Sequence, residues 1–114
     1  MAPEEVVERL CKLPHDFNVG KKSPSQLVAA SGVARCEAAV STEALAKFLA
    51  RHPELVEEWL HWSEDKRVSS GWYFLKERNE YVVGYYPNGE RLSFADPVRA
   101  CAEFVNREIE AIRA

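Results

Sequence analysis

The spacing of apolar residues changes its period near Val68, and this change constrains the fold more strongly than any other feature of the 114-residue chain. Before it, apolar residues recur every three or four positions, as they do along one face of an amphipathic helix. From there to Phe94 the period becomes two, in the runs WYFLK, YVVGYY and RLSF, which favours three short strands. Asp96 and Pro97 then indicate an N-cap and a first helical residue, after which the helical spacing returns.

These patterns predict an α+β fold. A chain of this length fits one domain and can bury roughly 65% of its extended-chain surface. We therefore expect a single domain of three consecutive parts: a helical N-terminal half (1–67), a three-stranded antiparallel β-meander (68–95) and a C-terminal helix (96–114) packed on the sheet.

Prolines and capping residues divide the N-terminal half. The first helix is expected to end before Pro14, because proline disfavours helical geometry at the residue that precedes it, and residues 15–22 are expected to form a loop. Ser23 followed by Pro24 predicts the start of a second helix, which Gly32 ends.

Two more helices are expected before the sheet. Ser41 or Thr42 caps the first of them, which ends near His52, and Pro53 begins the next, along ELVEEWLHWSEDK. Residues 33–40 (VARCEAAV) are ambiguous between a helical turn and a short strand, and their alanines favour helix.

The two turns of the meander set the register of the strands. The first turn, ERNE, pairs Trp72 with Tyr85, Phe74 with Val83 and Lys76 with Tyr81. The second turn, YPNGE, allows two registers. A two-residue Asn88-Gly89 loop would pair Tyr85 with Leu92 and Val83 with Phe94, whereas a three-residue loop would pair Gly84 with Leu92 and Val82 with Phe94.

Pro87 favours the three-residue loop. It lacks the amide that a tight loop would use, and its fixed φ suits the first central position of a type I turn. This register divides the rings between two faces, one with Trp72, Phe74, Tyr81, Val83, Tyr85, Arg91 and Ser93, the other with Tyr73, Leu75, Val82, Tyr86, Leu92 and Phe94.

Both faces are too apolar to lie open to water. The C-terminal helix can cover one, and the other must be covered by the N-terminal helices, a second subunit or a partner. The rings are then either core residues or, in part, a recognition surface. Because Trp, Tyr and Arg dominate interface hot spots, the candidate partner-binding residues are Trp72, Phe74, Tyr81, Tyr85 and Arg91.

Charge and cysteine content exclude several classes of protein. The net charge of −3 gives no general attraction for nucleic acid or for an anionic membrane. Three widely spaced cysteines offer neither a disulfide framework nor a metal-binding pair, which indicates a reducing compartment. The N-terminus lacks the pattern of a signal peptide, and no apolar stretch is long enough to span a bilayer, so we expect a cytoplasmic protein without a membrane partner.

No motif indicates catalysis. The three histidines, His15, His52 and His61, lack metal-ligand spacing, and the glycines are scattered, so the sequence predicts neither an enzyme nor a metal ion or other cofactor. The sequence favours a non-enzymatic module that binds a protein partner or associates with itself. An inhibitor or immunity-type protein is one form of it.

Two other surfaces complete the set of candidates. The helix after Pro53 carries an acidic surface made of Glu54, Glu57, Glu58, Glu64 and Asp65, which could bind a basic partner. The alternative function is nucleic-acid binding, either through residues 24–40, which loosely resemble a helix-turn-helix, or by stacking of bases on the aromatic face of the sheet.

Overall fold

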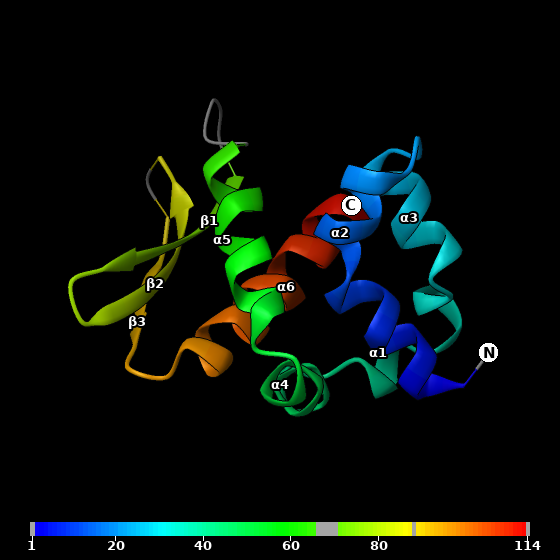
Figure 1. Cartoon of the computed structure of the whole chain (residues 1–114), viewed down its shortest axis with the longest axis horizontal. Helices are drawn as coiled ribbons and strands as arrows, with labels where there is room; N and C mark the ends of the chain where they lie inside the picture. Colours follow the sequence, from blue (N-terminus) through cyan, green and yellow to red (C-terminus); the bar gives the residue numbers. More distant parts are fainter. Residues whose placement is uncertain (1, 66–70, 88, 114) are drawn as a thin grey trace.

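Six α-helices and a three-stranded antiparallel sheet make up the part of the chain that the structure, a computed structural model, describes: residues 2–65, 71–87 and 89–113 (Figure 1). The helical N-terminal half, the meander and the C-terminal helix on the sheet are confirmed. The elements are α1 (Pro3–Cys11), α2 (Leu13–Val19), α3 (Pro24–Ala30), the 3₁₀ helices η1 (Val33–Arg35) and η2 (Glu37–Ala39), α4 (Thr42–Arg51), α5 (Glu54–Asp65), β1 (Gly71–Glu77), β2 (Glu80–Tyr86), β3 (Arg91–Phe94) and α6 (Pro97–Arg113).

Helix α2 occupies much of the segment that was expected to be a loop. The chain leaves helical geometry only briefly at Lys12, and Pro14 then lies in the first turn of α2. Proline is tolerated there because the amide it lacks would have no partner inside the helix. The prediction of a loop from residue 15 was therefore wrong, because Pro14 ends one helix and also opens another.

The predicted caps begin the other helices. The Ser23 hydroxyl accepts a hydrogen bond from the Gln26 amide at 3.2 Å, and the Gln26 side chain accepts one from the Ser23 amide at 2.8 Å, which completes a capping box. The Ser41 hydroxyl caps α4 in a similar way, and the Asp96 carboxylate accepts from the Val98 amide at 2.9 Å at the start of α6. These helix starts are confirmed.

Residues 33–40 form helical turns, but not an α-helix. Gly32 turns the chain with a φ of 87°, and η1 and η2, of three residues each, are separated at Cys36 by a non-helical backbone conformation. Local alanine propensity is a weak effect, and it does not join the two turns into one helix.

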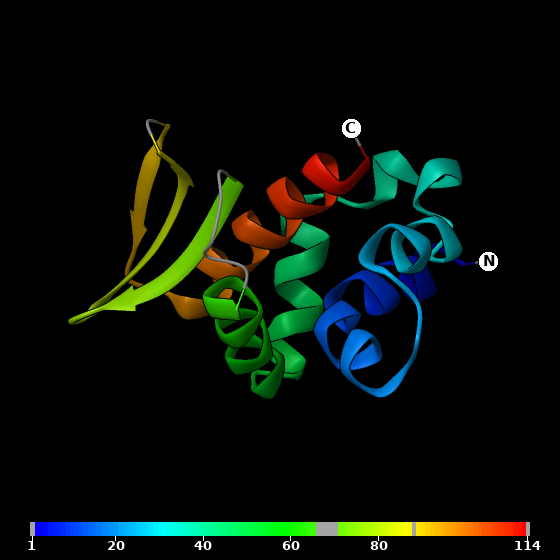
Figure 2. The same ribbon diagram turned by 90° about the horizontal axis from the view of Figure 1, so that it is seen from above.

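All the described helices lie on one side of the sheet (Figure 2). Helix α6 crosses the inner face of the sheet, and α5 runs beside β1. At this edge the Ser63 hydroxyl accepts a hydrogen bond from the Phe74 amide at 2.7 Å, so this amide of the edge strand has its partner on the neighbouring helix. The core joins sheet and helices, because the ring of Phe74 stacks on Phe104 with centroids 5.6 Å apart.

The first hairpin has the predicted register, and the second does not. Val83 pairs with Leu92 and Tyr81 with Phe94, one residue away from the expected pairing. The turn is longer than expected: the Tyr85 amide bonds the Glu90 carbonyl at 3.0 Å, and the Gly89 amide bonds the Tyr85 carbonyl at 2.8 Å, so the contacts between the two strands end at Tyr85 and Glu90. The peptide bond from Tyr86 to Pro87 is cis.

A shift of one residue exchanges the two faces of a strand. Leu92 and Phe94 therefore lie on the face toward the helices, where the three-residue loop would not have placed them. This inner face consists of Trp72, Phe74, Tyr81, Val83, Tyr85, Leu92 and Phe94. The outer face, which no described helix covers, consists of Tyr73, Leu75, Val82, Gly84, Tyr86, Arg91 and Ser93.

Candidate functional site

The inner face is largely closed by the protein's own helices. Phe74 is only 2% exposed and Val83 is fully buried, while Trp72 and Tyr81 are half-buried against the core. Tyr85 remains 39% exposed, near the end of β2. Of the predicted partner-binding residues on this face, Phe74 is thus a core residue, and Tyr85 is the one with a substantially accessible ring.

Trp72 and Tyr85 are brought together by the register of the first hairpin. They are cross-strand neighbours, and their rings meet edge to face with centroids 5.2 Å apart. Tyr81 lies near the other end of the pair of strands, next to Phe74 and below the ammonium group of Lys76, which is 5.8 Å from the ring centroid. Of the predicted partner-binding residues, Tyr81 is therefore not in one cluster with Trp72 and Tyr85.

The arginine beside Trp72 is Arg107 of α6. Its guanidinium carbon lies 4.6 Å from the centroid of the indole ring, within the range of a cation–π contact. The spacing of Glu103 and Arg107 indicates an ion pair on the helix surface. The contact with Trp72 depends on how α6 packs under the sheet, however, and no local signal predicts it.

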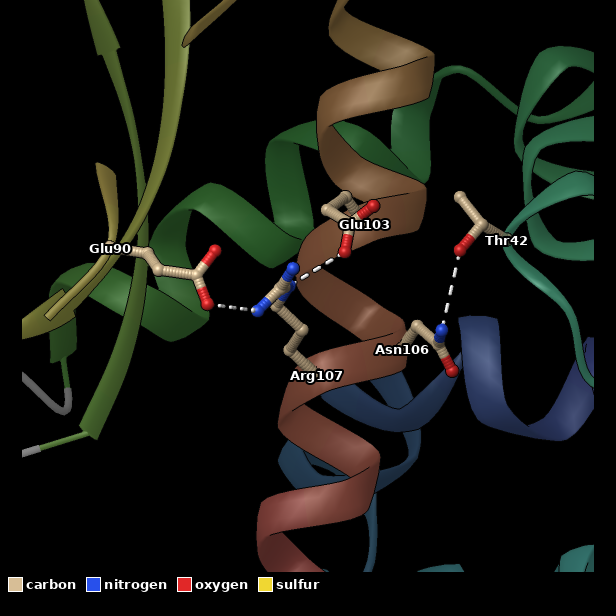
Figure 3. A network of polar contacts seen from close by, with 5 residues as sticks. All are labelled: Thr42, Glu90, Glu103, Asn106 and Arg107. Atoms are coloured by element: carbon tan, nitrogen blue, oxygen red, sulfur yellow. Dashed lines mark hydrogen bonds and ion pairs between the residues drawn. The ribbon is translucent and has the colours of Figure 1, made fainter. Parts of the chain in front are cut away.

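Two carboxylates neutralise Arg107 (Figure 3). The Glu103 carboxylate accepts from its Nε at 2.6 Å, and the Glu90 carboxylate, in the turn before β3, accepts from its Nη1 at 3.3 Å. The hydrogen bond to Glu103 is the main cause that raises the pKa of Arg107 above its ordinary value. On the neighbouring face of α6, the Asn106 amide donates to the Thr42 hydroxyl at 3.3 Å and ties α6 to α4.

Arg91, the fifth predicted partner-binding residue, lies on the outer face and not beside Trp72. The register of β3 causes this difference, because Arg91 pairs with Gly84. Its guanidinium donates to the Glu77 carboxylate at 2.8 Å, and its pKa is raised first by this hydrogen bond and second by one with Tyr73. Arg91 thus belongs to a polar network across the outer face.

The ring of Tyr73 covers Gly84 on the outer face. The two residues are cross-strand partners, and a Cβ atom at position 84 would lie 2.3 Å from the Tyr73 hydroxyl oxygen. Glycine leaves room for the ring, and the ring in turn shields the strand at a position without a side chain. Tyr86, the last residue of β2, is 60% exposed on the same face.

Four aromatic residues consequently gather at one end of the sheet, where β1 begins and β2 ends. This aromatic end consists of Trp72, Tyr73, Tyr85 and Tyr86. Tyr85 and Tyr86 are adjacent and point to opposite faces, so exposed rings are present on both sides of the sheet at this end.

The predicted acidic surface is only partly open. Glu54, Glu57 and Glu64 are exposed on α5, whereas Glu58 is half-buried and lies 3.6 Å from the His15 imidazole. Glu54 also has a histidine neighbour, His52, at 3.6 Å. The side chain of Asp65 lies outside the described residues.

Two of the three cysteines lie in the protein interior. Cys11 and Cys101 are buried, and burial raises the pKa of the Cys11 thiol to about 12 and that of Cys101 well above its ordinary value. Within the described ranges, no group of three or more His, Cys, Asp or Glu residues is arranged to hold a metal ion. In the same ranges, no helix is long and apolar enough to cross a membrane.

Comparison of the chain with protein-family models, with curated proteins and with solved structures gives no match. The fold itself places the chain among small α+β proteins with a helix-backed meander.

Proposed function

We propose that this is a non-enzymatic protein-binding module whose contact surface is the aromatic end of the sheet. The observation that carries the proposal is the exposure of two adjacent tyrosines, Tyr85 at 39% and Tyr86 at 60%, beside the half-buried rings of Trp72 and Tyr73. Tyrosine and tryptophan offer large, rigid, amphipathic contact areas, and they are enriched among the residues that dominate binding energies.

The rigidity of this surface supports the same proposal. The Trp72 ring contacts both the Tyr85 ring and the Arg107 guanidinium. The Tyr73 ring lies over Gly84 and beside Arg91. Side chains that are already ordered lose little conformational entropy on binding. Tyr86, which projects from this frame, is the residue whose truncation tests the surface with the least disturbance of the fold.

Among the described residues, the paired charges at this end favour a protein over a nucleic acid. Arg91 is paired with Glu77, and Arg107 is paired with both Glu90 and Glu103. Binding of nucleic-acid phosphates would need arginines that are available to pair with phosphate groups. These two arginines are already neutralised by carboxylates. The other proposed nucleic-acid element, residues 24–40, has two 3₁₀ turns where a recognition helix would be needed.

The experiment is affinity capture from the native cells with three forms of the protein: wild type, Tyr86→Ala and Val19→Ala. Val19 is a matched control, because it is an apolar residue that is 72% exposed on α2, away from the sheet (Figure 1). Captured proteins are quantified by mass spectrometry, and sedimentation of the pure protein tests whether the partner is a second copy. Both substitutions should leave thermal unfolding nearly unchanged.

We expect the recovery of at least one bound protein, or the amount of the self-associated form, to fall about tenfold with Tyr86→Ala and to be retained with Val19→Ala. Equal recovery with both variants would contradict the proposal. Salt-dependent binding of a mixed-sequence single-stranded oligonucleotide, followed by fluorescence anisotropy, would favour the nucleic-acid alternative instead.

A further inference from the structure

A cleft of about 430 Å³ lies between the C-terminal half of α6 and residues 33–40. Its volume is within the range of small-molecule binding sites. The α6 wall is formed by residues 106, 109, 110 and 113, whose spacing of three and four places them on one face of the helix. This end of α6 points away from the sheet in both views, so the cleft is separate from the aromatic end.

Three apolar side chains line the cleft, and Val40 has the most accessible surface of the three. Val33 and Ile109 are buried, and Val40 is half-buried against them. The accessible part of Val40 favours the apolar body of a ligand, because contact removes that surface from water.

Polar contacts join the two sides of the cleft near both of its ends. At one end the Asn106 amide donates to the Thr42 hydroxyl, just beyond the 33–40 segment, and at the other end Arg113 forms an ion pair with Glu37 of η2. Residues 106 and 113 are about two helical turns apart, roughly 10 Å along the axis. The cleft between them is therefore framed on both sides before any ligand arrives.

The charges that line the cleft do not cancel. The Glu37 carboxylate is paired with Arg113, whereas the Glu110 carboxylate has no hydrogen bond or ion pair with the described part of the chain. Two carboxylates and one guanidinium leave a net charge of −1 in the lining. This charge is complementary to one positive charge.

We propose that the cleft binds a small organic monocation, a primary amine with an aromatic or branched aliphatic body. The body contacts Val40 and the small accessible parts of Val33 and Ile109, and the ammonium group lies beside Glu110. This inference does not depend on the aromatic end, because the residues of the two sites differ. A lysine side chain of a peptide has the same ammonium chemistry, so the test must separate a free amine from it.

The test is a titration followed by the methyl NMR signals of Val33, Val40 and Ile109 at neutral pH. The probes share one body and differ in charge: phenethylamine, 2-phenylethanol and 3-phenylpropionate. A fourth probe, an acetylated and amidated Gly-Lys-Gly peptide, presents the ammonium on a protein-like backbone. The protein forms are wild type, Glu110→Gln and the control Glu80→Gln, which removes an exposed carboxylate in β2, far from the cleft.

We expect phenethylamine to shift these signals at lower concentration than the neutral and anionic probes. Glu110→Gln should weaken this binding by about two- to fivefold, and Glu80→Gln should leave it unchanged, because an exposed ion pair contributes modestly. Equal binding of the three charge forms would overturn the assignment to a cation. Tighter binding of the lysine peptide would overturn the assignment to a free amine, and no shift with any probe would overturn the site.

Discussion

Replacing Gly84 with alanine tests how the outer face of the sheet is packed. The new Cβ atom would lie 2.3 Å from the Tyr73 hydroxyl oxygen, 2.5 Å from its Cζ and 2.9 Å from the Glu90 carbonyl oxygen. The ring must therefore move, and the Glu90 backbone must shift by a few tenths of an ångström. Tyr73 would also lose its position beside Arg91.

The size of the effect follows from two opposing contributions. Overpacking of this kind costs about 1–3 kcal/mol, whereas replacing a strand glycine by alanine stabilises by about 0.5–1 kcal/mol where no clash occurs. We expect Gly84→Ala to lower the free energy of unfolding by about 1–2 kcal/mol. In a Tyr73→Ala background, where the ring is absent, the same substitution should be close to neutral.

Urea unfolding of the four proteins in this double-mutant cycle, followed by circular dichroism, measures the coupling between the two positions. A coupling energy of about 1 kcal/mol or more is expected. If the cost of Gly84→Ala is the same with and without the Tyr73 ring, within about 0.5 kcal/mol, the ring does not cover Gly84 and the description of the outer face is wrong.

Two further predictions concern the edge of the sheet and the core. Ser63→Ala removes the acceptor of the buried Phe74 amide, so it should cost about 1–3 kcal/mol and speed hydrogen exchange at that amide, and unchanged exchange would contradict the proposed edge contact. The pKa of the Cys11 thiol is about 12 in the folded protein against an ordinary 9.0. The buried, protonated thiol therefore makes its full contribution to the free energy of unfolding below pH 9, and this contribution is lost as the pH rises toward 12. Over this range the free energy of unfolding should therefore fall with rising pH more steeply in the wild type than in Cys11→Ala, by up to about 1.4 kcal/mol per pH unit. Parallel pH profiles of the two proteins would contradict burial of this thiol.

Local signals in the sequence predict where the elements begin. Ser23, Ser41 and Asp96 each precede a helix whose first amides their side chains satisfy, so a few neighbouring residues are sufficient for the prediction. Pro14 shows the limit of this approach, because a proline that ends one helix is equally suited to the first turn of the next.

The candidate site depends on longer-range structure and was predicted only in part. Trp72 and Tyr85 follow from the register of the first hairpin, which the sequence determines well. The register of the second hairpin depends on hydrogen bonds within the turn, and a shift of one residue moved Arg91 to the outer face. Arg107 of α6 lies beside Trp72 instead, and no short motif predicts how α6 packs.

The most direct test of the proposed function is photo-crosslinking from within the aromatic end. A benzoylphenylalanine residue in place of Tyr86 would project from this end, and the same residue in place of Val19 would project from α2. We predict that irradiation in the native cells gives a discrete protein adduct, or a covalent dimer, from position 86 and none of the same mass from position 19. The absence of an adduct from position 86, or the same adduct from both positions, would contradict the proposal that the aromatic end is the protein-binding surface.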